Sequence, residues 1–501
     1  MQEKDDIKLI KQNTSFKGDV ARLVGGTIIA QIIGIITVPI ISRYYSPNAY
    51  GILALFSSIT TIISSIACWR YELAITVPEG DKDGAALFFT SILTTAITSS
   101  IVFFIIYYFN SIFVFLNAEQ LIPYKLFIPA FVFINGIFAA CNYWNTRVKR
   151  FGKVSLSNII NSTFTRILNI ILGLNGFCSG GNMIFALVFG QFVSTITIMI
   201  GIIKSDLYYL KNVFSISNIK KVIFEYIKFP LVSIWGILLY NVSIQLPPIL
   251  LSFYFNSKIV GYFTFSYRLL SLPMSLIGSS ISQVFFQRSS QAYHEGKLTE
   301  VTQECYTNLF LLGLFPYSLL AFTAPELFKI VFGEQWANAG IYSQTLAIWM
   351  FVEFTCAPIT TLVETLNKQE TGMFYTVILV ILRAVALIVG GTNNNINLTI
   401  FLFMLAGAIT YFLWSISLLK LAACKPLDTI LKAIKKSSIT FLFIIIVCTI
   451  KYIIKLDNIY LISSILFISV IYYICLLYTN PEFNKLVMSK LNKNHAISKE
   501  Q

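Results

Sequence analysis

Residues 85–109 read AALFFTSILTTAITSSIVFFIIYYF, a continuous apolar segment long enough to cross a lipid bilayer as a helix. A spanning helix needs about 20 mainly apolar residues, because each residue advances the helix by about 1.5 Å. Its backbone must be hydrogen-bonded internally, since the bilayer core offers no water. The sequence therefore predicts an all-α polytopic membrane protein with about fourteen transmembrane helices. The expected spans are 20–41, 50–69, 85–109, 122–144, 154–174, 181–203, 229–253, 260–286, 303–323, 338–366, 372–391, 396–419, 437–455 and 459–479.

The bulk composition supports this interpretation. Of the 501 residues, 56% are hydrophobic and 12% are charged, whereas a soluble domain carries about 25% charged residues. The eight cysteines stand singly, without a C-x-x-C pair, so neither a disulfide nor a metal site is predicted, and no cofactor is expected. The first 19 residues are polar and highly charged, and no small-residue cleavage site follows the first span. A cleaved signal peptide is therefore not expected.

The net charge of +14 is explained by membrane topology. Lysine and arginine gather in alternate connections and at both ends of the chain, and a basic excess on one side marks the cytoplasmic face. With an even number of spans, both termini are expected in the cytoplasm. The longest polar connection, residues 204–228, is predicted to contain an amphipathic helix on the cytoplasmic surface. Anionic membrane lipids are therefore the expected partners of the basic residues, and nucleic acid is not.

Two halves of the chain look related. Residues 44–51 read YYSPNAYG, and residues 254–261, 210 positions later, read YFNSKIVG. Each segment has an aromatic pair, a polar turn and then a glycine that opens a new span. On the predicted topology both turns face outward, which indicates a parallel repeat that can bind cargo between two lobes and expose it alternately. The alternative is that aromatic and turn residues recur by chance.

The expected organisation has three parts. Residues 1–210 form an N-terminal lobe of six spans, residues 211–425 form a C-terminal lobe of six spans, and residues 426–501 hold two further spans and a cytoplasmic tail. Proline is expected to bend several of these spans, since it removes a backbone hydrogen bond of the helix. The prolines within or at the ends of spans are Pro39, Pro129, Pro230, Pro247, Pro248, Pro273 and Pro358.

Four arginines lie inside or at the margins of spans. Arg166 and Arg383 lie near the middle of theirs, Arg268 lies in the outer half of the eighth, and Arg70 lies near the cytoplasmic end of the second. A charge at a helix centre costs about 2.5–3.5 kcal/mol on insertion scales, so such residues are candidate functional sites. Arginine stays protonated and presents a planar fork of donors that suits phosphate or carboxylate.

Carboxylates in the spans offer both a second role and an alternative explanation. Glu353 lies near the middle of the tenth span, and Glu364 lies one to two turns from its cytoplasmic end. A buried carboxylate that alternates between charged and neutral states would suit proton or sodium coupling. Alternatively, these residues only form ion pairs with the arginines, and Glu72, two positions from Arg70, favours that explanation there.

Signals of catalysis or ATP hydrolysis are weak. Asp81-Lys82-Asp83 matches the D-x-D pattern of glycosyltransferases, but it lies in a turn of a few residues between two spans. The only histidines, His294 and His495, fall in predicted cytoplasmic segments. No P-loop or hydrolase motif occurs. An ion gradient, a membrane potential or the cargo gradient must then supply the energy, and an enzyme is not expected.

The run from Gly18 to Pro78 resembles the start of Wzx-type O-antigen and polysaccharide flippases of the multidrug/oligosaccharidyl-lipid/polysaccharide exporter superfamily. The resemblance is dense over roughly the first 290 residues and depends mostly on the number of spans afterwards. The segments that carry it are Gly25-Gly26-Thr27 to Gln31, Pro39 to Arg43, Tyr45-Ser46-Pro47, Tyr50-Gly51, Arg70-Tyr71-Glu72-Leu73-Ala74-Ile75, Phe229-Pro230, Gln245-Leu246-Pro247, Gly261-Tyr262, Leu272-Pro273 and Gln283-Val284-Phe285-Phe286.

The resemblance implies fourteen helices, two six-helix lobes, a cationic central cavity and a place in the bacterial plasma membrane. The implied cargo is an undecaprenyl-pyrophosphate-linked oligosaccharide, and the implied partners are a polysaccharide polymerase and a chain-length regulator. The lipid tail would stay in the bilayer while the head passes through a polar cleft. Arg166, Arg268 and Arg383, with Arg70 as a weaker candidate, are expected to compensate the pyrophosphate charge.

Three other functions compete with this one. A multidrug antiporter on the same fold would favour an acidic cavity, which four arginines disfavour. A polymerase or ligase of the glycan pathway usually has one large external loop. None of the connections expected on the outside is much longer than about a dozen residues. A multispanning acyltransferase would need a histidine base, and no predicted span contains one.

Overall fold

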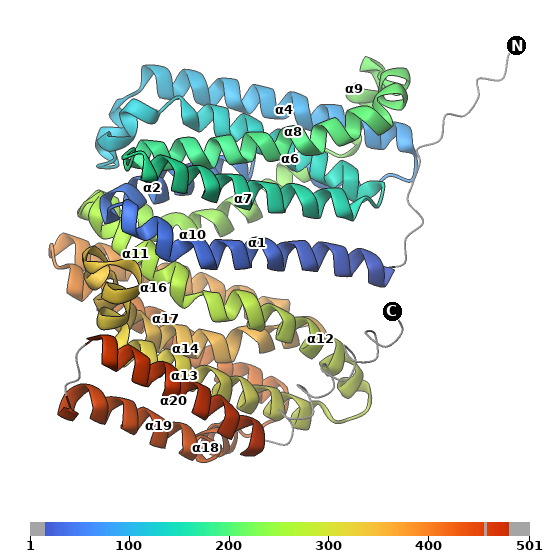
Figure 1. The fold of residues 1–501 in the computed structure, drawn as a ribbon. Coiled ribbons are helices and arrows are strands. Elements are labelled where there is room, and N and C mark those ends of the chain that lie inside the picture. The colour runs from blue at the N-terminus through green and yellow to red at the C-terminus, as the bar shows by residue number, and fades with distance from the viewer. Residues whose placement is uncertain (1–15, 455–457, 480–501) are drawn as a thin grey trace, which may run out of the picture. The chain divides into compact units, whose positions relative to one another are not determined.

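The computed structural model describes residues 16–454 and 458–479, in which the regular structure is helical (Figure 1). The chain forms two compact units. Unit 1 is built from the described parts of Met1–Phe265 and Val380–Leu402, and unit 2 from those of Ser266–Leu379 and Phe403–Gln501. The helices up to the first boundary are α1 (Phe16–Tyr44), α2 (Pro47–Ser64), α3 (Tyr71–Ala74), α4 (Asp81–Tyr108), α5 (Ser111–Phe115), α6 (Phe127–Arg147), α7 (Phe151–Leu174), α8 (Gly180–Val213), α9 (Ile216–Glu225), α10 (Ile234–Tyr254) and α11 (Ser257–Leu270). The remaining helices are α12 (Ser279–His294), α13 (Leu298–Phe332), α14 (Ala337–Cys356), α15 (Leu362–Thr365), α16 (Gln369–Thr392), α17 (Ile396–Leu421), α18 (Pro426–Lys436), α19 (Ser438–Thr449) and α20 (Asn458–Thr479).

The predicted polytopic membrane fold is confirmed. Within the described residues, nine helices are long and apolar enough to cross a membrane, or ten if the bent pair Pro426–Lys436 and Ser438–Ile454 counts as one span. Two shorter apolar helices, Ile28–Tyr44 and Tyr460–Leu476, lie near the two ends of the described chain. The described part of every expected span coincides with a helix or a broken helix of the structure.

Small residues bring the spans of unit 1 close together. A Cβ atom on Gly136 of α6 would lie 2.5 Å from the Thr95 methyl group of α4, so only glycine fits there. Thr95 lies in a buried row of hydroxyl residues on α4 whose side chains donate to helix carbonyls, as Thr95 does to Ser91 at 2.8 Å. Apolar lipid gives no hydrophobic drive for helix association, so close packing over small residues replaces it.

Two buried arginine side chains stabilise the predicted cytoplasmic end of unit 1 through hydrogen bonds. Arg150, which directly precedes α7, donates to both carboxylate oxygens of Asp206 on α8, at 2.7 and 2.9 Å, and the Trp144 indole donates to the same carboxylate at 2.9 Å. Arg147 donates to the Ile75 and Pro78 carbonyls, both at 2.8 Å. Both arginines have structural partners, and both lie outside the expected spans.

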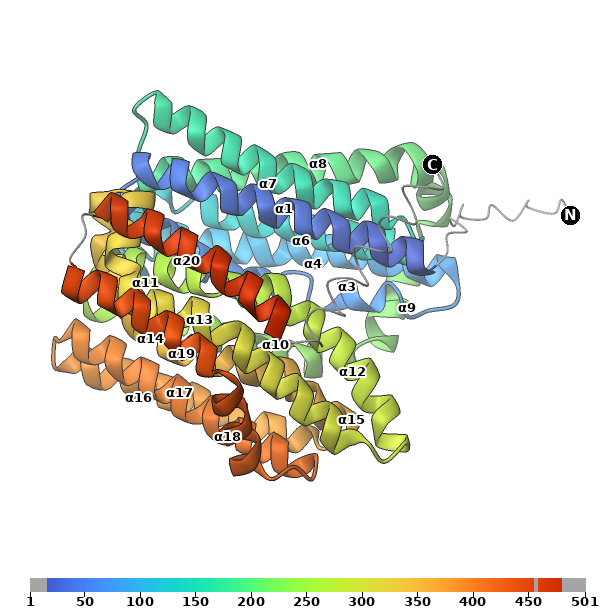
Figure 2. The same cartoon turned by 60° about the horizontal axis from the view of Figure 1, so that its bottom comes forward.

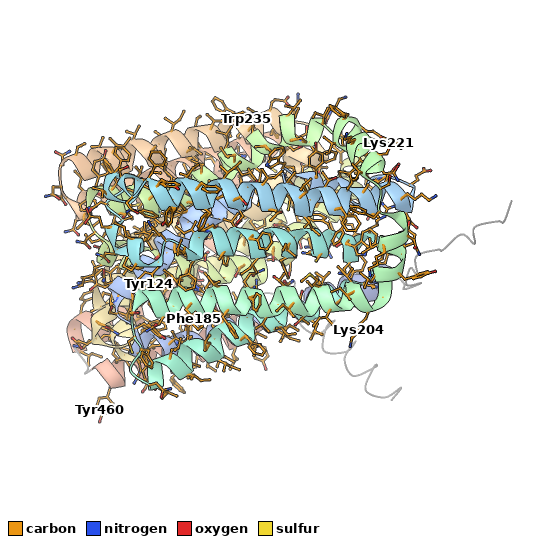
Figure 3. The ribbon with its side chains drawn as sticks, turned by 90° about the horizontal axis from the view of Figure 1, so that it is seen from above. Tyr124, Phe185, Lys204, Lys221, Trp235 and Tyr460 are labelled. Carbon is orange, nitrogen blue, oxygen red and sulfur yellow. The ribbon has the colours of Figure 1, made fainter. Side chains whose placement is uncertain are left out.

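The amphipathic helix expected in residues 204–228 is α9, although α8 continues further than predicted, to Val213. Lys221 of α9 forms an ion pair of 3.2 Å with Asp83 of α4, and this pairing raises the pKa of Lys221 above its ordinary value. In Figure 3, Lys204 and Lys221 lie at one end of unit 1 and Tyr124 lies toward the other.

The repeat predicted from the aromatic turns appears as a reciprocal contact inside unit 1. A Cβ on Gly51 of α2 would overlap the Ser257 carbonyl oxygen of α11, and a Cβ on Gly261 would overlap the carbonyl oxygen of Pro47. Each member of this contact has its counterpart 210 residues away. The repeat-related helices α2 and α11 therefore cross with their backbones in contact, as a pseudo-twofold axis requires.

Two further features differ from expectation. The connection from α4 to α6 covers residues 109–126 and contains α5, so it is longer than the dozen residues expected. The second span ends at Ser64, and residues 65–70 form turns before α3.

In unit 2, Phe315 of α13 stacks on Tyr472 of α20 with ring centroids 4.1 Å apart, so α20 packs directly on α13.

Candidate functional site

The eighth expected span is a broken helix. α11 ends at Leu270, Pro273 follows, a π-helical turn covers Met274–Gly278, and α12 then continues to His294. Proline lacks a backbone N–H and clashes with the preceding turn, so the hydrogen-bond ladder must rearrange there. π-Helical turns of this kind often mark functional positions in helices.

One side of this broken span is polar. Ser275, Ser279, Gln283 and Gln287 recur every four residues and are all exposed. On an α-helix this spacing places side chains on one face, one above another. We call these four residues the α12 stripe. Polar side chains within a span favour contact with other helices or with water over contact with lipid, so the stripe is a candidate hydrated surface.

Arg268 lies in the last turn of α11, just before the break, and it is exposed. No carboxylate of the described residues forms an ion pair with it. The other side of the span packs inward: Phe285 is buried, and the buried hydroxyl of Ser289 lies 3.1 Å from that of Thr365 on α15. The broken span therefore presents a guanidinium and a row of neutral polar groups.

Arg166 belongs to a polar face of α7 that contacts α1. Ser162, one turn earlier, donates to the Ala30 carbonyl at 2.9 Å. A Cβ on Gly34 of α1 would lie 3.7 Å from a terminal nitrogen of Arg166. A second polar row on α7 faces α8, where Asn161 donates to Gln191. The Arg166 side chain is thus half-buried and lies among polar residues of unit 1.

Arg383 occupies a corresponding position in α16. Both α7 and α16 are 24 residues long, and each carries its arginine in the second half. Gly173 near the end of α7 packs against Tyr44, and Gly391 near the end of α16 packs against Tyr254, the repeat counterpart of Tyr44. Arg383 is half-buried, like Arg166.

Arg70 pairs with Glu72, as the alternative explanation in the sequence predicts. Its Nη1 atom lies 3.2 Å from the Glu72 carboxylate, with 19% and 7% of the two side chains exposed. Both Trp69 and Arg70 adopt positive φ angles, 52° and 64°. L-residues rarely adopt this left-handed conformation, so the turn at Arg70 is held in place by its surroundings.

The two carboxylates have different environments. Glu353 of α14 is half-buried, and its Oε1 accepts a hydrogen bond of 3.2 Å from the Tyr411 hydroxyl of α17. Glu364 lies in α15 and is exposed, so it lacks the burial expected of a coupling carboxylate, and its role in ion coupling stays a prediction.

The expected site residues are distributed over both compact units. Arg70, Arg166 and Arg383 belong to unit 1, while Arg268, Glu353 and Glu364 belong to unit 2. The α12 stripe was missed in the sequence, although its four-residue spacing inside an expected span is a readable signal.

Comparisons with known proteins identify the family. The family model described as polysaccharide biosynthesis protein matches residues 40–340. The chain belongs to the polysaccharide biosynthesis protein family. No curated protein of similar sequence was found.

Solved structures show the fold of this family member. It is similar to the structure described as "Lipid II flippase MurJ, inward closed conformation", with a TM-score of 0.72 and 14% sequence identity over 94% of this chain and 99% of that chain. It is also similar to an inward-facing multidrug resistance MATE family transporter of the MOP superfamily, with a TM-score of 0.57 and 14% identity over 81% of this chain and 98% of that chain. These structures show the fold alone, and the family model confirms the polysaccharide biosynthesis family that the sequence led us to expect.

Proposed function

We propose that this polysaccharide biosynthesis family member is a flippase that moves an undecaprenyl-pyrophosphate-linked oligosaccharide from the cytoplasmic to the outer leaflet of the bacterial plasma membrane. The observation that carries the proposal is the broken eighth span, in which Arg268 and the four polar residues of the α12 stripe are all exposed. Both termini lie in the cytoplasm in this proposal, which follows from the basic connections. The product would then pass to a polymerase and a chain-length regulator.

The chemistry of the cargo suits these groups. The polyprenyl tail is as apolar as lipid and needs no protein passage. The pyrophosphate is the part that resists transfer, because an uncompensated charge is costly in a low-dielectric medium. Guanidinium groups compensate it with charge and with paired hydrogen bonds. Serine and glutamine side chains of the stripe replace water around the sugar hydroxyls.

Movement follows from the repeat. Two related halves that meet at a pseudo-twofold contact can rock and expose one site to either side in turn. The π-helical turn at Met274–Gly278 and the one at Phe229–Ser233 give the eighth and seventh spans places to bend. Glu353 with its Tyr411 partner is our candidate for ion coupling.

The test replaces Arg166, Arg268 and Arg383 singly with alanine and with lysine. Alanine removes the charge, whereas lysine keeps the charge but loses the planar fork. We expect surface polysaccharide to fall strongly in the alanine variants and partly in the lysine variants, with lipid-linked oligosaccharide accumulating on the cytoplasmic side. Lys297→Ala, an exposed cation in the α12–α13 turn, is the matched control and should behave as wild type.

The outcome separates the competing functions. Normal polysaccharide in well-expressed alanine variants of all three arginines would refute the proposed contact with the pyrophosphate. A deletion strain with normal polysaccharide but increased drug susceptibility would instead favour a multidrug antiporter. Glu353→Gln should abolish the dependence of transport on the ion gradient without reducing the amount of folded protein.

A further inference from the structure

We propose that α18, at Pro426–Lys436, docks on the anionic lipid surface of the cytoplasmic leaflet. The proposal concerns a surface away from the translocation residues and does not depend on the cargo. It rests on how α18 is held by its neighbours, on the apolar side chains that it leaves exposed, and on the charge beside them.

α18 is a short helix within unit 2. Its axis turns by 55° from that of the helix that follows it (Figure 2). Thr429 and Ala433 are buried on one edge of α18, which packs on α13. The preceding turn is tied down as well, because the Thr299 hydroxyl of α13 donates to the Ala422 carbonyl at 2.9 Å. The orientation of α18 is therefore fixed by tertiary contacts.

A second face of α18 is apolar and uncovered. Leu427, Leu431 and Ile434 follow at intervals of four and three residues, which places them on one side of a helix. Their side chains are 73%, 55% and 40% exposed. Three large aliphatic side chains aligned on a short helix are costly in water, and a lipid surface buries them.

Lysines occupy the neighbouring face. Lys432, Lys435 and Lys436 are exposed, Lys425 precedes the helix, and Asp428 is its single acidic residue. A helix with an apolar face and a basic face lies in the membrane interface, and its lysines meet anionic headgroups. The anionic leaflet is the complementary occupant. A second copy of the chain, with a net charge of +14, and the lysine-rich residues 480–501 would both repel this face.

The first experiment locates the apolar face. A nitroxide is attached at Leu431→Cys or at Lys435→Cys in the full-length protein, reconstituted in vesicles of phosphatidylcholine with phosphatidylglycerol. The chain without an added cysteine gives the background from its own cysteines. We expect the label at position 431 to collide with oxygen, which dissolves in lipid, and to be shielded from a water-soluble nickel chelate. The label at position 435 should show the opposite pattern.

Two results would overturn the proposal. A label at position 431 that is as accessible to the nickel chelate as the one at position 435 would place this face in water. A label shielded from both reagents would show that protein covers the face.

The second experiment tests the charge. The label at position 431 is compared in vesicles with and without phosphatidylglycerol, and in the variant Lys432→Gln/Lys435→Gln/Lys436→Gln. Each lysine near an anionic surface favours docking by about fivefold, so both changes should raise the access of the nickel chelate several-fold. The matched control, Lys204→Gln/Lys211→Gln/Lys220→Gln, removes three exposed lysines of α8 and α9 and should leave the signal unchanged. A signal that is insensitive to lipid charge and to the α18 lysines would exclude anionic lipid as the occupant.

Discussion

The contact between Gly51 and Gly261 predicts how this protein responds to one added methyl group. In Gly51→Ala the new Cβ would lie 2.6 Å from the Ser257 carbonyl carbon, whereas ordinary van der Waals contact is 3.4–4 Å. Backbone cannot turn aside as a side chain can, so α2 and α11 must separate by roughly 1 Å or more. Overpacking of this kind typically costs about 1–3 kcal/mol.

That cost applies only to the arrangement in which the two helices touch. If rocking of the repeats separates them, the substitution shifts the population toward the separated state by about 5- to 150-fold. Ser257→Cys is a suitable reporter, because Ser257 is 1% exposed and cysteine has nearly the same size. We expect a membrane-impermeant maleimide, added from outside, to label this cysteine much faster when Gly51→Ala is also present.

Two other glycines of this chain provide a control and a second test. Gly236→Ala adds a methyl group to α10 where nothing lies within 4 Å, and labelling should stay slow. Gly261→Ala should reproduce the effect of Gly51→Ala, because its new Cβ would overlap the Pro47 carbonyl oxygen. Equally slow labelling in both glycine variants, with folded protein, would mean that this contact does not separate during transport.

Two further predictions use contacts within single units. Asp206→Asn leaves the buried Arg150 guanidinium without its counter-charge, and loss of one partner of such a pair costs about 3–5 kcal/mol. We expect thermal unfolding of the purified variant to have a clearly lower midpoint temperature. An unchanged midpoint would contradict the structural role of this ion pair. Gln283→Leu makes the α12 stripe apolar and should reduce transport, whereas Val284→Leu, at an exposed apolar position beside it, should not; equal transport by both variants would remove the stripe from the passage.

The sequence was sufficient for the spans because each depends on local chemistry. A run such as residues 85–109 must be helical in a bilayer, whatever its neighbours are. The turn before Gly51 and its counterpart before Gly261 were likewise readable, since both consist of aromatic and turn residues at fixed spacing. Their direct contact was not readable, because backbone proximity depends on how separate helices pack.

The arginines show the limit of sequence reasoning. All four are costly in a bilayer, but only the folded chain distinguishes their surroundings. Arg70 forms an ion pair with Glu72, while Arg268 is exposed beside a polar stripe. Arg150 was not a candidate site residue because it lies outside the expected spans. Its side chain is nevertheless only 5% exposed and forms an ion pair with Asp206.

The sequence by itself determined that this protein lies in a membrane, because long apolar segments and one-sided basic connections require a multispanning helical protein. Only the tertiary structure decided which polar groups are exposed and which are enclosed, such as the α12 stripe and Arg150. The physical reason is that lipid sets the secondary structure residue by residue, through the backbone, whereas the exposure of a side chain depends on helices that are far apart in the chain.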